Sequence, residues 1–139
     1  MVFVIIQFAL LFFMGIVTNW ENIKMASIIL ILAAIILGLW AIFTMGIYKV
    51  NVLPDIKKGA TLVTHGPYKL IRHPMYTSLL VLCTGLILSN PVWYMFLGFL
   101  FLLIDLVFKL RYEEKKLVAV FPEYEKYKSG TYYFIPFIY

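Results

Sequence analysis

The sequence predicts an all-α, polytopic membrane protein with about four transmembrane helices. Hydrophobic residues occupy 63% of the 139 positions, and charged residues occupy only 14%. A soluble domain of this length could not bury so much apolar surface, so we expect lipid to cover much of it. The apolar residues also fall into blocks that are separated by polar segments. A chain this short is expected to form one domain over residues 1–139.

Two helices are predicted in the N-terminal part of the chain. The first block, Val2 to Val17, is uncharged and is followed by a short polar turn in which Trp20 is an interfacial anchor. A signal peptide is the alternative, but no basic segment precedes the block and no small-residue cleavage site follows it. The second block, Met25 to Ile47, is long enough to cross a membrane with some tilt. Neither block carries a charge, so residues 1–48 are interpreted as scaffold.

A second pair of helices is predicted after the long polar connection 48–72. Pro74 suits the first turn of a helix that ends near Leu88. The uncharged turn at 89–91 then leads into a fourth helix, from Val92 to about Phe108. These two helices are expected to form a C-terminal hairpin within residues 49–139.

Beyond Lys109 the pattern becomes amphipathic. Apolar residues recur near helical spacing among charged ones, which indicates a helix that leaves the membrane and then lies along it. Gly130 is expected to end this helix. The aromatic tail Tyr132–Tyr139 is predicted to pack at the membrane interface.

The basic residues predict the orientation of the chain. Lys24 stands alone, and the other Lys and Arg residues lie at 49–72 or from Lys109 onward. With four helices these two regions share one side of the membrane, and the positive-inside rule makes that side cytoplasmic. We therefore expect an integral multi-pass protein with both termini in the cytoplasm. The stretches richest in reactive groups, Leu62–Tyr76 and Lys109–Lys116, then face the same compartment.

The polar residues of the third helix allow two interpretations. His73, Thr77 and Thr84 lie close together on one face of the predicted helix. The threonines could simply form hydrogen bonds between helices. His73 and Tyr76 follow directly after Arg72, and for these two residues a functional role is favoured.

The acidic residues of the fourth helix also allow two interpretations. Asp105 is the one ionisable residue clearly within an apolar run, and an intramembrane carboxylate is a functional candidate by default. A salt bridge to Lys109, one turn further on, is the structural alternative. Glu113 and Glu114 could be solvated charges at the point where the helix leaves the membrane.

Several kinds of chemistry can be set aside. The chain has no glycine-rich phosphate loop, no HExxH motif and no nucleophile elbow. Two histidines without a partner pattern do not predict a metal site, and the single cysteine, Cys83, forms no disulfide framework. The remaining carboxylates, aromatic rings and cations suit a polar, zwitterionic cofactor, because they can contact ribose hydroxyls, a purine and a carboxylate respectively.

Two motifs carry a family resemblance. The stretch LVTHGPYKLIRHPMY, an apolar hairpin and then EEKKLVAVFPEYEKY resemble the isoprenylcysteine carboxyl methyltransferase family of integral membrane enzymes, which is related to the phospholipid methyltransferases. The resemblance covers roughly Pro54 to Pro136. It implies S-adenosylmethionine-dependent methyl transfer to a lipid-borne acceptor, with the cofactor bound from the cytosol and the lipid or lipidated substrate entering from the bilayer.

The resemblance also implies roles for particular residues. Lys109 takes the place of a substrate-handling arginine, and Arg111 and Glu114 join it as candidate catalytic residues. The implied cofactor-binding residues are Thr61, Leu62, Val63, Tyr68, His73, Pro74, Met75, Tyr76 and Glu113.

Three departures from the family pattern bear on these roles. Lysine at 109 cannot offer the planar two-pronged grip of arginine on a carboxylate, which puts a prenylcysteine carboxylate in question as the acceptor. Ser78 stands where glycine is common, and Phe121-Pro122 stands where Phe-Gly is usual. An amine acceptor would need a base, for which Glu113, Glu114 or His73 is available.

Two other functions remain open. Membrane sterol-type reductases resemble the cofactor-binding half and bind a nicotinamide dinucleotide, but they are generally larger. A small membrane protein that binds lipid or assists assembly, without catalysis, is the second alternative.

Overall fold

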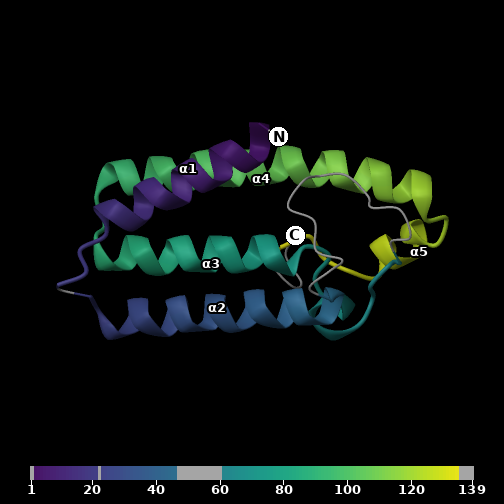
Figure 1. The fold of residues 1–139 in the computed structure, drawn as a ribbon, viewed down its shortest axis with the longest axis horizontal. Helices are drawn as coiled ribbons and strands as arrows, with labels where there is room; N and C mark the ends of the chain where they lie inside the picture. The colour runs from purple at the N-terminus through teal and green to yellow at the C-terminus, as the bar shows by residue number, and fades with distance from the viewer. Residues whose placement is uncertain (1, 22, 47–60, 135–139) are drawn as a thin grey trace.

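The computed structural model describes residues 2–21, 23–46 and 61–134, and this part of the chain is helical. Four long helices lie side by side along one axis (Figure 1). The six helical elements are α1 (Val2–Val17), α2 (Met25–Met45), the 3₁₀ turn η1 (Gly66–Lys69), α3 (Pro74–Ser89), α4 (Trp93–Val120) and α5 (Tyr124–Ser129). The prediction of an all-α fold is therefore confirmed.

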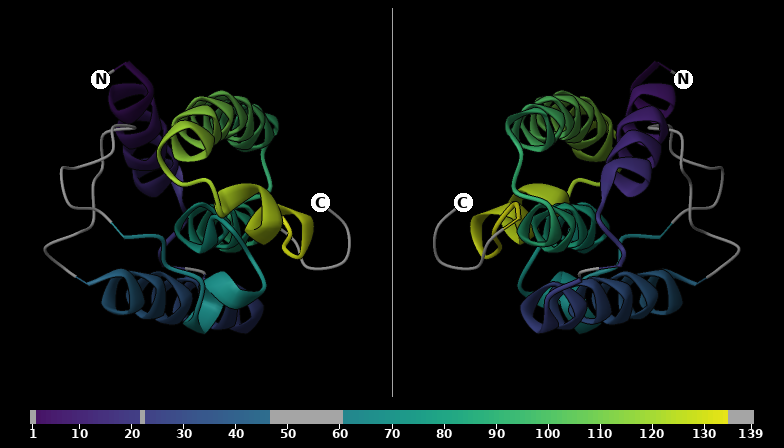
Figure 2. Two further views of the ribbon diagram at one scale, coloured as in Figure 1. Left: turned by 90° about the vertical axis from the view of Figure 1, so that its right-hand side faces the viewer. Right: turned by 90° about the vertical axis from the view of Figure 1, so that its left-hand side faces the viewer.

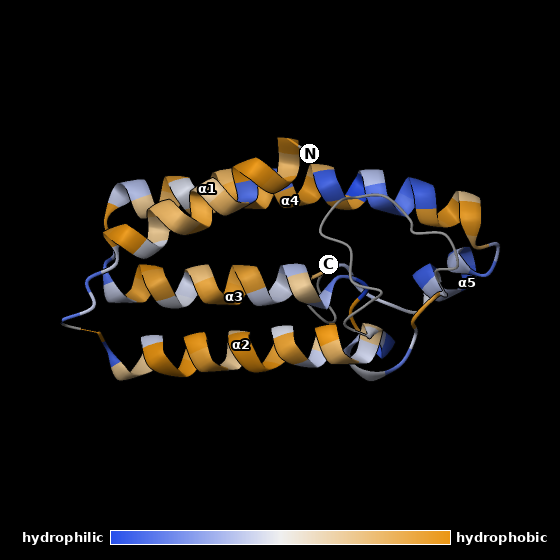
Figure 3. Cartoon of the chain, in the orientation of Figure 1, coloured by the Kyte–Doolittle hydropathy of each residue, from blue (hydrophilic) through white to orange (hydrophobic). Residues whose placement is uncertain are grey.

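Two of these helices, α2 and α4, are long and apolar enough to cross a membrane. The other two long helices, α1 and α3, have 16 residues each, which corresponds to roughly 24 Å against a hydrocarbon core of about 30 Å. Hydrophobic residues cover most of the four helices. Hydrophilic residues gather at the end formed by the last turns of α4, η1 and α5 (Figure 3).

The four helices are arranged as two close pairs. Viewed end-on, α1 lies beside α4, and α3 lies between this pair and α2 (Figure 2). The helix α3 packs mainly against α2, and α4 packs mainly against α1. The turn that joins α3 to α4 is held by the end of α1, since Asn90 Nδ2 donates to the Val17 carbonyl at 2.8 Å.

Small residues bring α2 and α3 close together. Ser27, Ala34 and Ala41 are buried on α2 at a spacing of seven residues. On α3, a Cβ atom at Gly85 would lie 3.1 Å from the Ser27 carbonyl oxygen, so a side chain there would not fit without movement. Small residues at such interfaces allow backbones to approach closely, which favours helix association in lipid.

Ser78 also lies at this interface. A Cβ atom at Gly38 of α2 would lie 3.2 Å from Ser78 Oγ, and that hydroxyl donates to the Met75 carbonyl at 2.7 Å. The glycine on α2 therefore provides the space for a serine at the position where the family commonly has glycine.

The predicted start of the fourth helix agrees with the structure to within one residue, but its predicted C-terminal end was wrong. It continues without a break from Trp93 to Val120, 28 residues, instead of ending near Phe108. The predicted amphipathic helix up to Gly130 is interrupted by Pro122, because a proline disfavours helical geometry in the residue before it. Phe121 accordingly has extended geometry, and the short helix α5 follows, with Gly130 at its end as predicted.

The last described segment, residues 131–134, packs against the start of α3. Tyr132 N donates to the Leu70 carbonyl at 3.0 Å, and Arg72 N donates to the Tyr132 carbonyl at 2.7 Å. Phe134 is buried, and its carbonyl accepts a hydrogen bond from Thr77 at 2.8 Å. This part of the aromatic tail therefore packs inside the protein, and residues 135–139 lie outside the described residues.

The threonines of α3 have structural partners. Thr77 donates to Phe134 and to the His73 carbonyl, whereas Thr84 is exposed and donates to the Leu80 carbonyl of its own helix at 2.8 Å. Among the described residues none of these bonds joins two helices, so the predicted hydrogen bonds between helices are not formed by these two threonines, although both hydroxyls have structural partners.

We predict that Gly85→Ala destabilises the protein. Its methyl group would contact Ile31, Leu30 and the Ser27 carbonyl at 3.1–3.2 Å, and such overpacking costs about 1–3 kcal/mol. The matched control is Gly15→Ala on α1, where nothing lies within 4 Å and alanine favours the helix. Thermal unfolding in detergent should show a lower midpoint for Gly85→Ala only. Equal midpoints for both variants would contradict the close packing of α2 and α3.

Candidate functional site

The two polar clusters that the sequence placed on one side of the membrane are in contact in the structure. Pro74 occupies the first position of α3, where its missing N–H costs nothing, and His73 caps the helix. The His73 carbonyl accepts from the backbone N–H groups of Tyr76 and Thr77. This start of α3 faces Glu113 and Glu114 on α4, so residues about 40 positions apart in the sequence meet.

Glu113 contacts the start of α3 through two side chains. Tyr76 Oη donates to Glu113 Oε1 at 2.6 Å. His73 Nδ1 lies 3.8 Å from Glu113 Oε2, and the rings of His73 and Tyr76 stack at 5.3 Å between centroids. The Glu113 side chain is only partly buried, so it retains lone pairs that can accept further hydrogen bonds.

Glu114 has a different environment, although it is the next residue. Its Oε1 accepts from Arg72 Nε at 2.8 Å and from Tyr124 Oη at 3.1 Å. His73 Nε2 lies 3.6 Å from the same oxygen, and Lys128 Nζ lies 3.9 Å from Oε2. Glu114 therefore joins α4 to α3 and α5, and Glu113 is the better candidate to contact a ligand.

Arg72 is a central residue of the site that the sequence analysis left out of its candidates. Besides its bond to Glu114, its Nη1 donates to the carbonyls of Lys128, at 2.8 Å, and Thr131. Its guanidinium carbon lies 3.9 Å from the centre of the Tyr133 ring. Its position directly before His73 was the one feature of the sequence that could have indicated a role for Arg72 in the site. The contribution of Tyr124, by contrast, depends on the chain reversal at Pro122.

Tyr68 adds a buried hydroxyl to this region. Burial raises the pKa of Tyr68 well above its usual value, and Tyr127 and Glu113 add to this effect. The ring therefore stays neutral, and its hydroxyl has no hydrogen-bond partner among the described residues. His73 Nε2 also makes no hydrogen bond within the described residues, although it lies 3.6 Å from Glu114 Oε1.

The tyrosines of α5 also stay protonated. Burial raises the pKa of Tyr127 to about 12, although Arg72 opposes the shift. Burial and the neighbouring Glu114 raise the pKa of Tyr124 as well. Tyr127 Oη donates to the Tyr68 carbonyl at 2.6 Å, so α5 is held against η1.

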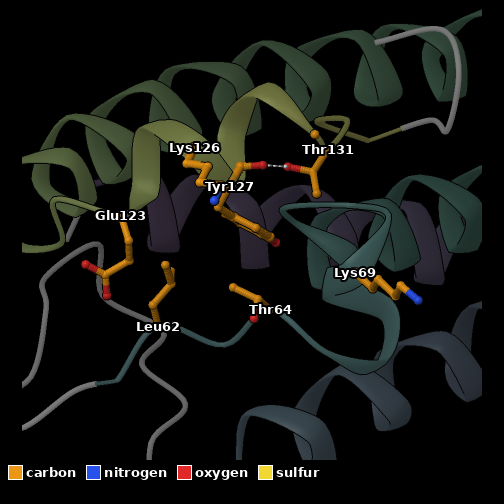
Figure 4. Close-up of a pocket in the computed structure, with 8 residues that line it drawn as sticks. Leu62, Thr64, Lys69, Glu123, Lys126, Tyr127 and Thr131 are labelled. Carbon is orange, nitrogen blue, oxygen red and sulfur yellow. Dashed lines mark hydrogen bonds between the residues drawn. The ribbon is translucent and has the colours of Figure 1, made fainter.

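An open pocket of about 390 Å³ lies between α5 and the segment that precedes η1 (Figure 4). Of the predicted cofactor residues, Leu62 lines it. Thr61 is exposed, and Val63 and Met75 are partly buried. The other lining residues were not predicted; they are Thr64, Lys69, Glu123, Lys126, Tyr127, Gly130 and Thr131.

The three predicted catalytic residues lie in different places. Glu114 is in the network described above, and Lys109 is buried one turn before Glu113. Lys109 Nζ donates to Gln7 Oε1 at 3.1 Å and lies 5.0 Å from the centre of the Tyr76 ring. Arg111 is exposed, and the structure gives it no contact with the other two among the described residues. Gln7 was missed, although it is the only amide in its apolar block.

No group of three or more His, Cys, Asp or Glu residues in the described ranges could hold a metal ion.

The comparisons with known proteins give one match. A family model described as phospholipid methyltransferase matches residues 22–124, which is well over half of the chain. The comparisons with curated proteins and with solved structures give no significant match. The matched region contains α2, α3 and α4 and all of the cluster around Glu113. The chain therefore belongs to the phospholipid methyltransferase family.

Proposed function

We propose that this protein transfers a methyl group from S-adenosylmethionine to a lipid-borne acceptor at the cytosolic face of a membrane. Membership of the phospholipid methyltransferase family implies a membrane methyltransferase. The observation that supports the cofactor site best is the convergence of Glu113 with Tyr68, His73 and Tyr76, which come from three separate elements.

The chemistry of this cluster fits the cofactor. The free lone pairs of Glu113 can accept hydrogen bonds from ribose hydroxyls, and the aromatic ring of Tyr68 can pack against the purine. The Tyr68 hydroxyl, which has no hydrogen-bond partner among the described residues, can supply a further hydrogen bond. The backbone of Thr61, Leu62 and Val63 would contact the cofactor from the other side. When bound, the cofactor supplies a methyl group that its sulfonium already activates.

The residues of the chain then have to orient the acceptor and exclude water. The acceptor atom has to lie about 3–3.5 Å from the methyl group, on the side opposite the sulfur. An amine acceptor also has to lose a proton, and Glu113, Glu114 or His73 could accept it. Arg72, His73 and Glu114 are buried, so water is excluded from the part of the cluster that these residues form. A cationic sulfonium would also be favoured near the Glu113 carboxylate and the Tyr76 ring.

We favour a phospholipid amine over an isoprenylcysteine carboxylate as the acceptor. Lys109 stands where the prenylcysteine enzymes have arginine, and its ammonium cannot make the planar two-pronged contact with a carboxylate that a guanidinium makes. The family match is also to phospholipid methyltransferases.

We further propose that α1 to α4 all span the membrane, with both termini in the cytoplasm. The hydrophilic end of the molecule contains the last turns of α4, η1 and α5 (Figure 3). Basic residues at this end, including Lys69, Lys115 and Lys126, favour the cytosolic side.

We predict that Glu113→Gln weakens cofactor binding. Hydrogen bonds to a charged acceptor contribute about 1.5–3 kcal/mol, so the dissociation constant should rise roughly 10-fold to 100-fold. Isothermal titration calorimetry with S-adenosylmethionine measures this change. Glu125→Gln, at an exposed position on α5, is the matched control and should bind as the wild type does. An unchanged affinity in Glu113→Gln would remove Glu113 from the cofactor site.

We also predict that purified protein transfers label from methyl-labelled S-adenosylmethionine to the phospholipid fraction of total membrane lipid. Mass spectrometry of the labelled species identifies the acceptor. Label on a prenylated cysteine would instead support the carboxylate acceptor. A sterol-type reductase would give no labelled lipid, and a nicotinamide dinucleotide, not S-adenosylmethionine, would raise its melting temperature. A non-enzymatic protein would show neither label nor stabilisation.

A further inference from the structure

Four polar side chains form a second buried cluster, deeper in the helical bundle than the cluster around Glu113. Asp105 and Lys109 come from α4, Gln7 from α1 and Tyr76 from α3. The exposed fractions of Asp105 and Lys109 are only 6% and 2%. Ionisable groups this deep in an apolar helix are costly to bury, and they are typically retained for a function.

The hydrogen bonding of this second cluster is incomplete. Asp105 Oδ2 is buried without a hydrogen-bond partner among the described residues. Lys109 has three N–H donors, of which one is directed at Gln7 Oε1. Its ammonium also faces the Tyr76 ring at 5.0 Å. Within the described residues, no ion pair joins Lys109 to Asp105. One hydrogen-bond acceptor, Asp105 Oδ2, and two N–H donors of Lys109 therefore have no partner in this cluster, and they lie one helical turn apart.

The position of this cluster along α4 suggests what it contacts. Asp105 precedes Glu113 by eight residues, which corresponds to roughly 12 Å along the helix axis toward the membrane interior. Tyr76 connects the two clusters, because its hydroxyl contacts Glu113 and its ring contacts Lys109. A lipid that entered from the bilayer would therefore meet Asp105 and Lys109 on the membrane side of the cofactor site.

We propose that Asp105 and Lys109 bind the headgroup of the acceptor, and that Asp105 makes the site selective for a lipid amine that carries N–H groups. Asp105 Oδ2 accepts hydrogen bonds from the amine, and the spare donors of Lys109 contact the phosphate. This inference rests on the proposed function. It assigns acceptor selectivity to a residue outside the cofactor cluster.

The test measures binding without the cofactor. Purified protein is titrated with short-chain phosphatidylethanolamine and with short-chain phosphatidylcholine, whose nitrogen has no N–H. The wild type should bind the former about tenfold more tightly, as expected for a hydrogen bond to a charged acceptor. Asp105→Asn, which keeps the size of the side chain, should lose this preference and still bind phosphatidylcholine. Glu125→Gln on α5 is the control and should keep the preference.

Two further arms test the role of Lys109 and the source of the headgroup. Lys109→Met should weaken binding of both lipids by the same factor, because they share the phosphate. Glycerophosphoethanolamine, which lacks acyl chains, should bind more weakly than the lipid. Equal or tighter binding of this soluble headgroup would overturn the assignment to a lipid.

A purely structural role for Asp105, as a counter-ion of Lys109, predicts different results. Asp105→Asn would then lower the melting temperature, Asp105→Asn/Lys109→Gln would restore it, and the preference between the two lipids would be the same in every variant. An unchanged preference in Asp105→Asn overturns the proposal. Failure of the proposed function is seen separately, as the absence of S-adenosylmethionine binding by the wild type.

Discussion

The buried ion pair between Arg72 and Glu114 is the interaction on which the arrangement of the site depends. It joins Arg72, two residues before α3, to the last turns of α4, and the same guanidinium holds α5 and residues 131–134 through two backbone carbonyls. A buried charge of either sign would be costly without its partner. The pair therefore fixes the spacing at which His73 and Tyr76 meet Glu113, which is the geometry that a cofactor would need.

The two neighbouring glutamates of α4 have different partners. On a helix, successive residues point about 100° apart, so Glu113 and Glu114 cannot face the same partners. Glu114 points toward Arg72, Tyr124 and Lys128 and is fully engaged. Glu113 instead contacts Tyr76 and His73. The paired acidic motif thus provides one carboxylate that holds the fold together and one that we propose contacts the cofactor.

Much of the fold could be predicted from the sequence, because it depends on local patterns. The uncharged blocks predicted the limits of α1 and α3. The family motifs predicted that His73 and Tyr76 lie near Glu113. The sequence analysis missed Arg72 as a central residue and Gln7 as the partner of Lys109. Both depend on tertiary contacts between residues that are 42 positions apart (Arg72 and Glu114) and 102 positions apart (Gln7 and Lys109). The periodicity of the sequence does not predict contacts over such distances. The length of α4 was missed because the charged residues from Lys109 onward were interpreted as an amphipathic helix that lies along the membrane.

The unbroken course of α4 has a mechanical consequence. A continuous helix is stiff, so the vertical offset between Asp105 and Glu113 is set by the helical rise and not by the surrounding lipid. In a thicker or thinner bilayer, the protein would tilt as a unit or the lipid around it would deform locally. Membrane composition would then alter how often an acceptor reaches the protein, while the depth at which its headgroup is held relative to the aqueous end stays constant.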